Sequence, residues 1–278
     1  MDVIHSVADL RKRLGAEASI ALVPTMGNLH AGHLSLVEIA KQRGRCVVAS
    51  IFVNRLQFEP GGDFERYPRT LERDCEVLRA AGCHVVFAPD EKEMYPQHQE
   101  ITVTPPRVAE TLEGHYRPGH FQGVTTVVAK LFNIVAPHAA VFGKKDYQQL
   151  LVLRALERQL DFGIEIVAGE TVREADGLAM SSRNGYLSAG ERAKAPQLAH
   201  ELRAIKERVE AGSHRHERLD EMAAANLTIA GWNVDYVAIR NRADLAPPHP
   251  HDRALVVLAA AWLGKTRLID NLEIEVRA

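Results

Sequence analysis

The sequence predicts an α/β protein, a Rossmann-like parallel sheet with helices on both faces, followed by a smaller C-terminal α+β domain. Two observations lead to this fold class. Up to about residue 170, short apolar runs alternate with amphipathic helical patterns, which is typical of a parallel sheet covered by helices. After Arg173 the pattern changes to one long charged segment and three strand-like runs. We therefore expect two domains, residues 1–176 and 177–278.

The first domain is predicted from its apolar runs and from the helices between them. The expected strands are residues 20–23, 46–53, 84–87, 139–142 and 164–167. One helix contains Leu34 and closes with Lys41 before Gly44, since basic residues and then glycine commonly end helices. Another carries the helical stripe at residues 124–135 and ends before Pro137, because proline cannot continue a helix.

The second domain begins with turn and capping signals. Asn184-Gly185 is a turn dipeptide, and Ser188 with Glu191 has the spacing of a capping box that should open one long helix towards Gly212. The expected strands are residues 234–239, 254–258 and 267–269, with a proline-rich loop at 246–250. This order of elements predicts a small α+β domain.

Composition excludes several classes of partner. The formal net charge is −2, so no broad positive field attracts nucleic acid. Three cysteines in no CxxC pair cannot close a disulfide framework, which indicates a reducing compartment. No apolar run reaches the roughly 18 residues of a membrane span, and no signal-peptide pattern opens the chain. We expect a cytoplasmic protein with neither nucleic acid nor membrane as a partner.

The most informative segment is residues 24–33, PTMGNLHAGH, between the first strong strand and the first strong helix. Gly27 and Gly32 permit close approach of backbone to a ligand, and a helix N-terminus offers N–H groups and a positive dipole end. His30 and His33, three residues apart, can donate hydrogen bonds to phosphate oxygens. The alternative is a polar turn in which one histidine is merely a cap. The ligand site is favoured, because open α/β sheets bind ligands at the carboxyl ends of their strands.

Two later segments also offer phosphate-binding groups. Residues 142–149, FGKKDYQQ, place lysines at a strand end, although Asp146 and Gln149 also have capping-box spacing and both residues would then be structural. Residues 180–183, MSSR, supply two hydroxyls and a guanidinium near the domain boundary, where they would form a flap that excludes water from a reactive intermediate.

Together these segments resemble the pantothenate synthetase family of the HxGH nucleotidyltransferase-like superfamily. Three further motifs extend the resemblance: FVNRLQF at residues 52–58, YPRT at 67–70 and GHFQGV at 119–124. All lie in the family's order and spacing and together span most of residues 20–190. The combination is highly specific, whereas any one motif alone is only moderately so.

The resemblance implies an enzyme, an AMP-forming acid–amino-acid ligase that converts ATP and pantoate to pantoyl adenylate and then transfers the acyl group to β-alanine. It implies catalytic roles for His33, His30 and Lys145, with His33 as proton donor. It implies pantoate binding by Asn54, Gln57 and Gln149. The implied ATP-binding residues are Met26, Gly27, Asn28, Leu29, His30, Ala31, Gly32, His33, Gly143, Lys144, Lys145, Asp146, Val172, Met180, Ser181, Ser182 and Arg183.

The resemblance also implies a homodimer, and ATP chemistry calls for Mg²⁺. We expect the phosphate oxygens to supply most of the magnesium ligands, with Asp74 as a weak protein candidate. The chain departs from the family at Arg55, where proline is usual. Arg55 either loosens the loop that carries Gln57 or secures it through a salt bridge.

Two alternatives stay open at this point. A sister adenylyltransferase acting on a phosphorylated acceptor would carry the same histidines. Such an acceptor calls for extra positive charge, and Arg55 is the residue that supports this alternative. A non-catalytic nucleotide sensor or RNA-associated module is disfavoured by the near-neutral charge and by the lack of an added basic domain.

Overall fold

A computed structural model describes residues 1–59 and 62–276 of the protein. The chain divides into two compact units. Unit 1 combines Met1–Lys144 with Val152–Glu170, and unit 2 combines Lys145–Leu151 with the chain from Thr171 onward. Val172 therefore belongs to unit 2, together with the MSSR segment.

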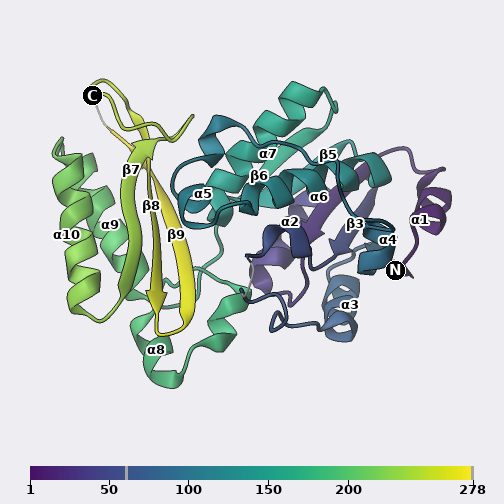
Figure 1. The fold of residues 1–278 in the computed structure, drawn as a ribbon, viewed down its shortest axis with the longest axis horizontal. Helices are drawn as coiled ribbons and strands as arrows, with labels where there is room; N and C mark the ends of the chain where they lie inside the picture. The colour runs from purple at the N-terminus through teal and green to yellow at the C-terminus, as the bar shows by residue number, and fades with distance from the viewer. Residues whose placement is uncertain (60–61, 277–278) are drawn as a thin grey trace. The chain divides into compact units, whose positions relative to one another are not determined.

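Unit 1 is built on a parallel sheet, as predicted, and the sheet has six strands where the sequence predicted five (Figure 1). Its strands are β1 (Asp2–Ile4), β2 (Ile20–Thr25), β3 (Cys46–Ile51), β4 (Val85–Phe87), β5 (Ala139–Gly143) and β6 (Glu165–Gly169). Their order in the sheet is β1-β4-β3-β2-β5-β6, and every neighbouring pair is parallel. The three residues of β1 are too few to form a recognisable apolar run, which is why the sequence did not predict this strand.

The helices of unit 1 are α1 (Val7–Leu14), α2 (Ala31–Lys41), α3 (Leu71–Ala80), α4 (Glu91–Met94), α5 (Glu113–Tyr116) and α6 (His120–Val135), with 3-10 turns η1 (Arg55–Gln57) and η2 (Arg107–Ala109). The 3-10 turn η3 (Lys144–Asp146) and helix α7 (Tyr147–Leu160) cross the boundary between the units, because Lys145–Leu151 belongs to unit 2. Leu36 and Val37 of α2 and Leu78 of α3 pack with alternate residues of β2 and β3 in one buried cluster. The long predicted helix before Pro137 is α6, which contacts β2 and α1.

The strand order places the beginnings of two predicted phosphate segments, PTMGNLHAGH and FGKKDYQQ, on neighbouring strands of unit 1. From β2 the chain passes through β3 and β4 towards one edge, whereas β5 is followed by β6 at the other edge. The order therefore reverses between β2 and β5, and open α/β sheets bind ligands at such a point. The HxGH segment leaves the carboxyl end of β2, and Gly143 and Lys144 lie at the carboxyl end of β5.

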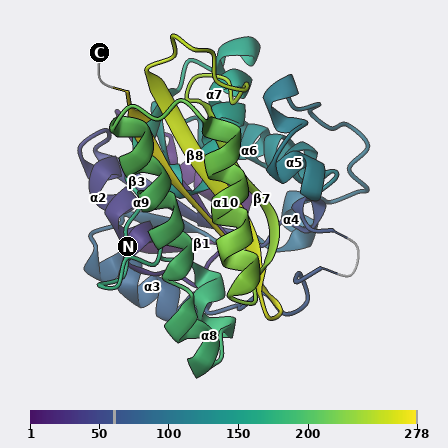
Figure 2. The ribbon, with the colours of Figure 1, turned by 90° about the vertical axis from the view of Figure 1, so that its left-hand side faces the viewer.

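Unit 2 is a three-stranded antiparallel sheet with helices on one face (Figure 2). Its elements are η4 (Ser182–Tyr186), α8 (Ala189–Lys194), α9 (Gln197–Glu210), α10 (His216–Ile229), β7 (Asn233–Asn241), β8 (Ala254–Leu263) and β9 (Thr266–Glu275). In Figure 2, α9 and α10 lie side by side over the strands. Alternate residues of β8, such as Leu255 and Val257, meet Leu202 of α9 and Leu227 of α10 in the buried core.

The predicted long helix after Ser188 is wrong in one respect. The capping box forms, with the Ser188 N–H donating to Glu191 Oε2 at 2.8 Å and the Glu191 N–H to Ser188 Oγ at 3.3 Å. The helix nevertheless stops at Lys194, and α9 starts anew at Gln197. Pro196 explains the break, because it has no N–H to donate to the preceding turn. The Asn184-Gly185 turn lies within η4.

Other expectations from composition concern membranes and cysteines. None of the helices in residues 1–59 and 62–276 has the length and apolar character to cross a membrane. Cys46, Cys75 and Cys83 are all free and buried. Burial raises the pKa of the Cys46 thiol to about 11, so this thiol stays protonated near neutral pH.

Asp220 of α10 should make unit 2 less stable as the pH rises from about 4 to about 7. Both of its carboxylate oxygens accept the Ile239 N–H at 3.1 Å, yet burial raises the pKa of Asp220 to about 7. Arg240 opposes this rise, and Glu217 and Glu221 add to it. A carboxyl with a raised folded-state pKa holds its proton longer when folded, so ionisation above the unfolded value of 3.8 disfavours the folded state.

We expect Asp220→Asn to raise the free energy of unfolding at pH 7 by about 1–3 kcal/mol and to leave it nearly unchanged at pH 4, because each pH unit between the two pKa values contributes up to about 1.4 kcal/mol. Denaturant unfolding at both pH values measures this. Glu207→Gln, at an exposed position on α9, is the control. An equal gain at pH 4 and pH 7 would contradict the assignment.

Candidate active site

The loop after β2 has a backbone shape that few residues permit. Gly27 has φ 84° and Asn28 has φ 51°, both in the left-handed region that glycine and asparagine adopt most readily. A Cβ on Gly27 would lie 3.0 Å from Asp74 Oδ2 and 3.2 Å from the Ile51 side chain. A side chain at this position would therefore strain the backbone and crowd Asp74 and Ile51.

Asp74, at the start of α3, fastens this loop. Its side chain is only 1% exposed. Oδ2 accepts the Asn28 N–H at 2.9 Å and the Thr70 hydroxyl at 3.0 Å, and Oδ1 accepts the Leu29 N–H at 2.9 Å. A carboxylate that accepts several N–H and O–H bonds holds its donors strongly. Asp74 thus fixes the backbone immediately before His30.

The two histidines of the HxGH motif form a reciprocal cap at the N-terminus of α2. His30 Nδ1 accepts the Gly32 N–H at 3.2 Å, and His33 Nδ1 accepts the His30 N–H at 3.3 Å. Their ring centroids lie 4.1 Å apart. A neutral imidazole that accepts at Nδ1 carries its proton on Nε2. Each ring therefore presents an Nε2–H donor beside the positive end of the helix dipole.

Neutral amide side chains gather at η1, after β3. Asn54 is 1% exposed, and its Nδ2 donates to Gln57 Oε1 at 3.2 Å and to the Gly123 carbonyl at 3.1 Å. The Tyr95 hydroxyl donates to Asn54 Oδ1 at 2.7 Å, and burial raises the pKa of Tyr95, so it remains a donor. Gln57 Nε2 donates to Met26 Sδ at 3.0 Å, which connects η1 to the HxGH loop.

The start of α6 supports the same turn. His120 Nδ1 lies 2.9 Å from the Gln57 carbonyl, and its Nε2 lies 3.2 Å from Arg117 NH1. Because arginine only donates, Nε2 accepts and the Nδ1–H donates to Gln57. A Cβ on Gly123 would lie 2.3 Å from the Leu56 carbonyl oxygen, so α6 can approach η1 this closely only through glycine. Sequence reasoning assigned no role to His120 or Tyr95, although His120 lies in the GHFQGV motif.

In unit 2 the predicted ATP segments are joined by a short hairpin. The Met180 N–H donates to the Val172 carbonyl at 3.0 Å, and Arg173 pairs with Ala179 in an antiparallel bridge. Ser181 then caps η4 by accepting the Arg183 N–H on its hydroxyl at 3.2 Å. Val172 and residues 180–183 are therefore held as one local structure.

Lys145 is held within unit 2 as well. Its carbonyl accepts the Asn271 amide of β9 at 2.8 Å, and the Tyr147 hydroxyl donates to Glu273 of the same strand at 3.0 Å. The preceding Lys144, in unit 1, pairs with Glu170 at 2.6 Å.

The predicted site residues thus lie in two sets. Unit 1 carries residues 26–33, Asn54, Gln57, Gly143 and Lys144 at the carboxyl side of its sheet. Unit 2 carries Lys145, Asp146, Gln149, Val172 and residues 180–183.

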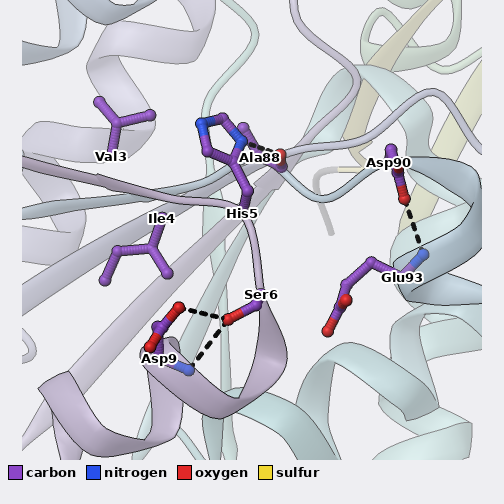
Figure 3. A pocket seen from close by; sticks show the side chains of 8 residues that line it. All are labelled: Val3, Ile4, His5, Ser6, Asp9, Ala88, Asp90 and Glu93. Carbon is purple, nitrogen blue, oxygen red and sulfur yellow. Dashed lines mark hydrogen bonds between the residues drawn. The ribbon is translucent and has the colours of Figure 1, made fainter.

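A pocket of about 640 Å³ lies elsewhere in unit 1, at the carboxyl ends of β1 and β4 (Figure 3). Its polar groups are used in local structure. Ser6 caps α1 and bonds to Asp9, Asp90 caps α4 through the Glu93 N–H, and His5 bonds to the Ala88 carbonyl. None of the predicted site residues lines this pocket. We interpret it as a structural junction between two capped helices.

No group of three or more histidine, cysteine, aspartate or glutamate side chains that could hold a metal ion occurs among residues 1–59 and 62–276. Asp74 already accepts three hydrogen bonds from the protein. These bonds use both carboxylate oxygens of the one residue that the sequence suggested for magnesium.

Comparison with known proteins identifies the family. The family model described as pantoate-beta-alanine ligase matches residues 2–273. The chain belongs to this family. A protein named pantothenate synthetase from Nitrosospira multiformis is 60% identical over 274 residues, covering 99% of this chain and 98% of its own. One from Neisseria meningitidis serogroup C is 56% identical over 277 residues, covering 99% and 100%. The predicted enzyme class, a ligase, is thereby confirmed.

Solved structures of pantoate-beta-alanine ligases share the fold. Pantothenate synthetase from Thermus thermophilus superposes with a TM-score of 0.94 at 45% identity, covering 99% of this chain and all of that one. Pantoate-beta-alanine ligase from Francisella tularensis, solved with beta-gamma ATP and beta-alanine, has a TM-score of 0.83 at 31% identity, covering 98% and 97%. The predicted fold class is confirmed.

Proposed function

We propose that this chain condenses pantoate with β-alanine at the expense of ATP. A pantoate carboxylate oxygen attacks the α-phosphorus, which forms pantoyl adenylate and releases pyrophosphate. The β-alanine amine then attacks the acyl carbon, loses a proton and displaces AMP. Family membership over residues 2–273 supports this reaction, as does the ligand set named for the Francisella tularensis structure.

The observation that carries the proposal is the pair of histidines at the reversal point of the sheet. Both rings accept a backbone N–H at Nδ1 in the cap of α2, so the proton of each neutral ring is on Nε2. Donors fixed in advance stabilise charge that develops on phosphate oxygens without reorganising during the reaction. His30 and His33 take this role here, and His33 donates a hydrogen bond from Nε2–H to the pyrophosphate that leaves.

The amides of Asn54 and Gln57 suit a hydroxy acid. They offer donors and acceptors without a negative charge that would repel ATP. We also assign Gln149 of α7 to pantoate binding, because its side chain is a neutral amide as well. We assign Lys145 and residues 180–183 of unit 2 to ATP binding, through their positive charges and hydroxyl groups.

Magnesium enters this scheme as part of the substrate, bound to the phosphate oxygens of ATP. Asp74, the protein candidate, has both carboxylate oxygens engaged by Asn28, Leu29 and Thr70. We therefore assign Asp74 the role of holding the HxGH loop in shape.

This assignment gives a prediction for Asp74→Ala. The change leaves the Asn28 and Leu29 N–H groups without their acceptor, which costs about 1–3 kcal/mol for each buried donor. We expect a lower melting temperature and a KM for ATP raised about 10-fold or more. The magnesium concentration that gives half-maximal activity, measured at saturating ATP, should not change. A clear rise in that concentration would instead favour direct ligation by Asp74.

The sister reaction on a phosphorylated acceptor is less well supported. Arg55 was the one residue that suggested extra positive charge for such an acceptor. Its guanidinium is already paired with Glu65 and Glu91, so it offers little net charge to a phosphate. The neutral amides beside it favour a carboxylic acid.

A pyrophosphate-release assay tests the proposed function. With ATP and magnesium, pyrophosphate should appear only when pantoate is added, and AMP with pantothenate only when β-alanine follows. Release that does not depend on pantoate, or that requires a phosphorylated acceptor, would refute the proposal.

We further propose a cytoplasmic homodimer. The free, buried cysteines suit a reducing compartment. Light scattering during size-exclusion chromatography measures the mass directly, and a monomer at micromolar concentration would contradict the dimer.

A further inference from the structure

The turn η1 carries the residues proposed to bind pantoate, yet no cap of its own secures it. Asn54, its N-cap residue, makes no side-chain capping bond, because its Oδ1 accepts the Tyr95 hydroxyl instead of a backbone N–H of the turn. The backbone of the turn is closed by two bonds, Gln57 N–H to the Asn54 carbonyl at 3.3 Å and Phe58 N–H to the Arg55 carbonyl at 3.1 Å. The position of Gln57 therefore depends on contacts from outside the turn.

Arg55, the first residue of η1, supplies such contacts in three directions. Its Nε donates to Glu91 of α4 at 3.1 Å, and NH1 donates to Glu65 at 3.3 Å. Its Cζ lies 4.0 Å from the centre of the Phe64 ring. Phe64 is 7% exposed and packs edge-on against Phe58, with 5.3 Å between ring centres. The guanidinium thus stacks on a fixed aromatic surface while its edge holds two carboxylates.

The orientation of the Gln57 side chain needs this support. Its Nε2 donates to a thioether sulfur, Met26 Sδ, which is a weak acceptor. Only Asn54, on the same turn, donates to its Oε1 in the described contacts. A shift of the backbone at Arg55 would therefore move the Gln57 amide with little resistance.

The conformation of η1 at position 55 suits proline as well as arginine. The resemblance to the pantothenate synthetase family implies proline at this position, and proline is well tolerated as the first residue of a helical turn, where its missing N–H has no intrahelical partner. Asn54 has φ −82° and ψ 106°, an extended conformation that also suits a residue before proline. Proline would restrict this backbone through its own ring, whereas arginine restricts it through side-chain contacts with other parts of the chain.

We propose that Arg55 is a positioning residue for substrate binding, which replaces the stiffness of proline by its contacts to Glu91, Glu65 and Phe64 and so sets the place of Gln57. This inference rests on the proposed function for the identity of the acid. The Arg55 side chain is 53% exposed, so each ion pair alone is weak and screened by salt.

The test compares Arg55→Ala, Arg55→Pro and Glu91→Gln with the wild-type enzyme, using steady-state kinetics at low and high salt. Arg55→Ala should raise the KM for pantoate about 3–10-fold, with the KM for ATP and kcat little changed, the size expected for losing two exposed ion pairs and one cation–π contact. Glu91→Gln should show a smaller rise. Arg55→Pro should restore a KM near that of the wild type and lose its salt dependence. Lys92→Ala is the control: it removes one positive charge, as Arg55→Ala does, from an exposed position on α4, and it should leave both KM values unchanged.

Hydrogen exchange gives a readout that does not depend on activity. The Gln57 and Phe58 amides should exchange faster in Arg55→Ala than in the wild type and return towards the wild-type rate in Arg55→Pro. Unchanged exchange and KM in Arg55→Ala would overturn the inference, as would an Arg55→Pro variant as impaired as Arg55→Ala. If the wild-type enzyme shows no pantoate-dependent turnover, the proposed function fails, and the exchange rates alone still decide whether Arg55 holds the turn.

Discussion

His33→Ala is expected to lower kcat about 10²–10³-fold while changing ATP affinity little. An Nε2–H aimed at a phosphate contributes most when negative charge builds in the transition state, so its loss appears mainly in turnover. Steady-state kcat and the dissociation constant of ATP, measured by calorimetry, separate the two effects. A variant that bound ATP weakly but turned over normally would refute the transition-state role.

The reciprocal cap of α2 calls for a matched variant, because His33→Ala also removes the acceptor of the His30 N–H. Glutamine at this position of a capping box supplies such an acceptor through its side-chain oxygen. We expect His33→Gln to recover most of the roughly 1 kcal/mol of cap stability lost in His33→Ala. Turnover should remain low, since the amide does not reproduce the imidazole proton donor. Recovery of turnover along with stability would mean that His33 acts only as a cap.

The placement of the two histidines at the start of a helix was predictable, because everything that defines this placement is local. A strand, a glycine-rich turn and a helix start lie within residues 20–33, so the motif and its structural context can be read together. Asp74 was different, since it reaches the same loop from 45 residues away, and a lone carboxylate in the sequence suggested a metal ligand. Its hydrogen bonds depend on the pairing order of the strands, which no local pattern contains.

The positioning residues around η1 follow the same rule. Tyr95 and His120 lie 41 and 63 residues from the groups they bond, Asn54 and Gln57. Arg55 was noticed only as a departure from the family pattern. The sequence left open whether Arg55 loosens the loop or secures it through a salt bridge. The answer depended on the carboxylate of Glu91, which the fold places beside Arg55. The structure favours the salt bridge over a loosened loop.

Arg173→Ala is expected to lower the free energy of unfolding of unit 2 by about 3–5 kcal/mol, the cost of leaving a buried charge without its partner. Arg173 binds Asp270 of β9 through two parallel bonds, at 2.7 and 2.9 Å, and also donates to the carbonyls of Gly177 and Asn271 at 3.1 Å. The Asp270 side chain is only 2% exposed. The Asp270 carboxylate therefore depends on the guanidinium for its pairing.

The same change should weaken nucleotide use, because Arg173 pairs with Ala179 in the bridge beside Val172 and Met180. We expect the KM for ATP to rise in Arg173→Ala even where the enzyme is fully folded. Chemical denaturation and steady-state kinetics at a temperature well below unfolding measure the two effects separately.

The control variant for this ion pair is Arg242→Ala. Arg242 also pairs with a carboxylate of β9, Glu275 at 2.6 Å, but the two side chains are 31% and 65% exposed. An exposed pair contributes about 0–1 kcal/mol, so this variant should barely change stability. Asp270→Asn removes the buried charge itself, and in the double variant with Arg173→Ala it should cost less than the sum of the two single changes. Additive effects, or a loss in Arg173→Ala no larger than in Arg242→Ala, would show that the buried pair does not hold the Val172–Met180 hairpin to β9.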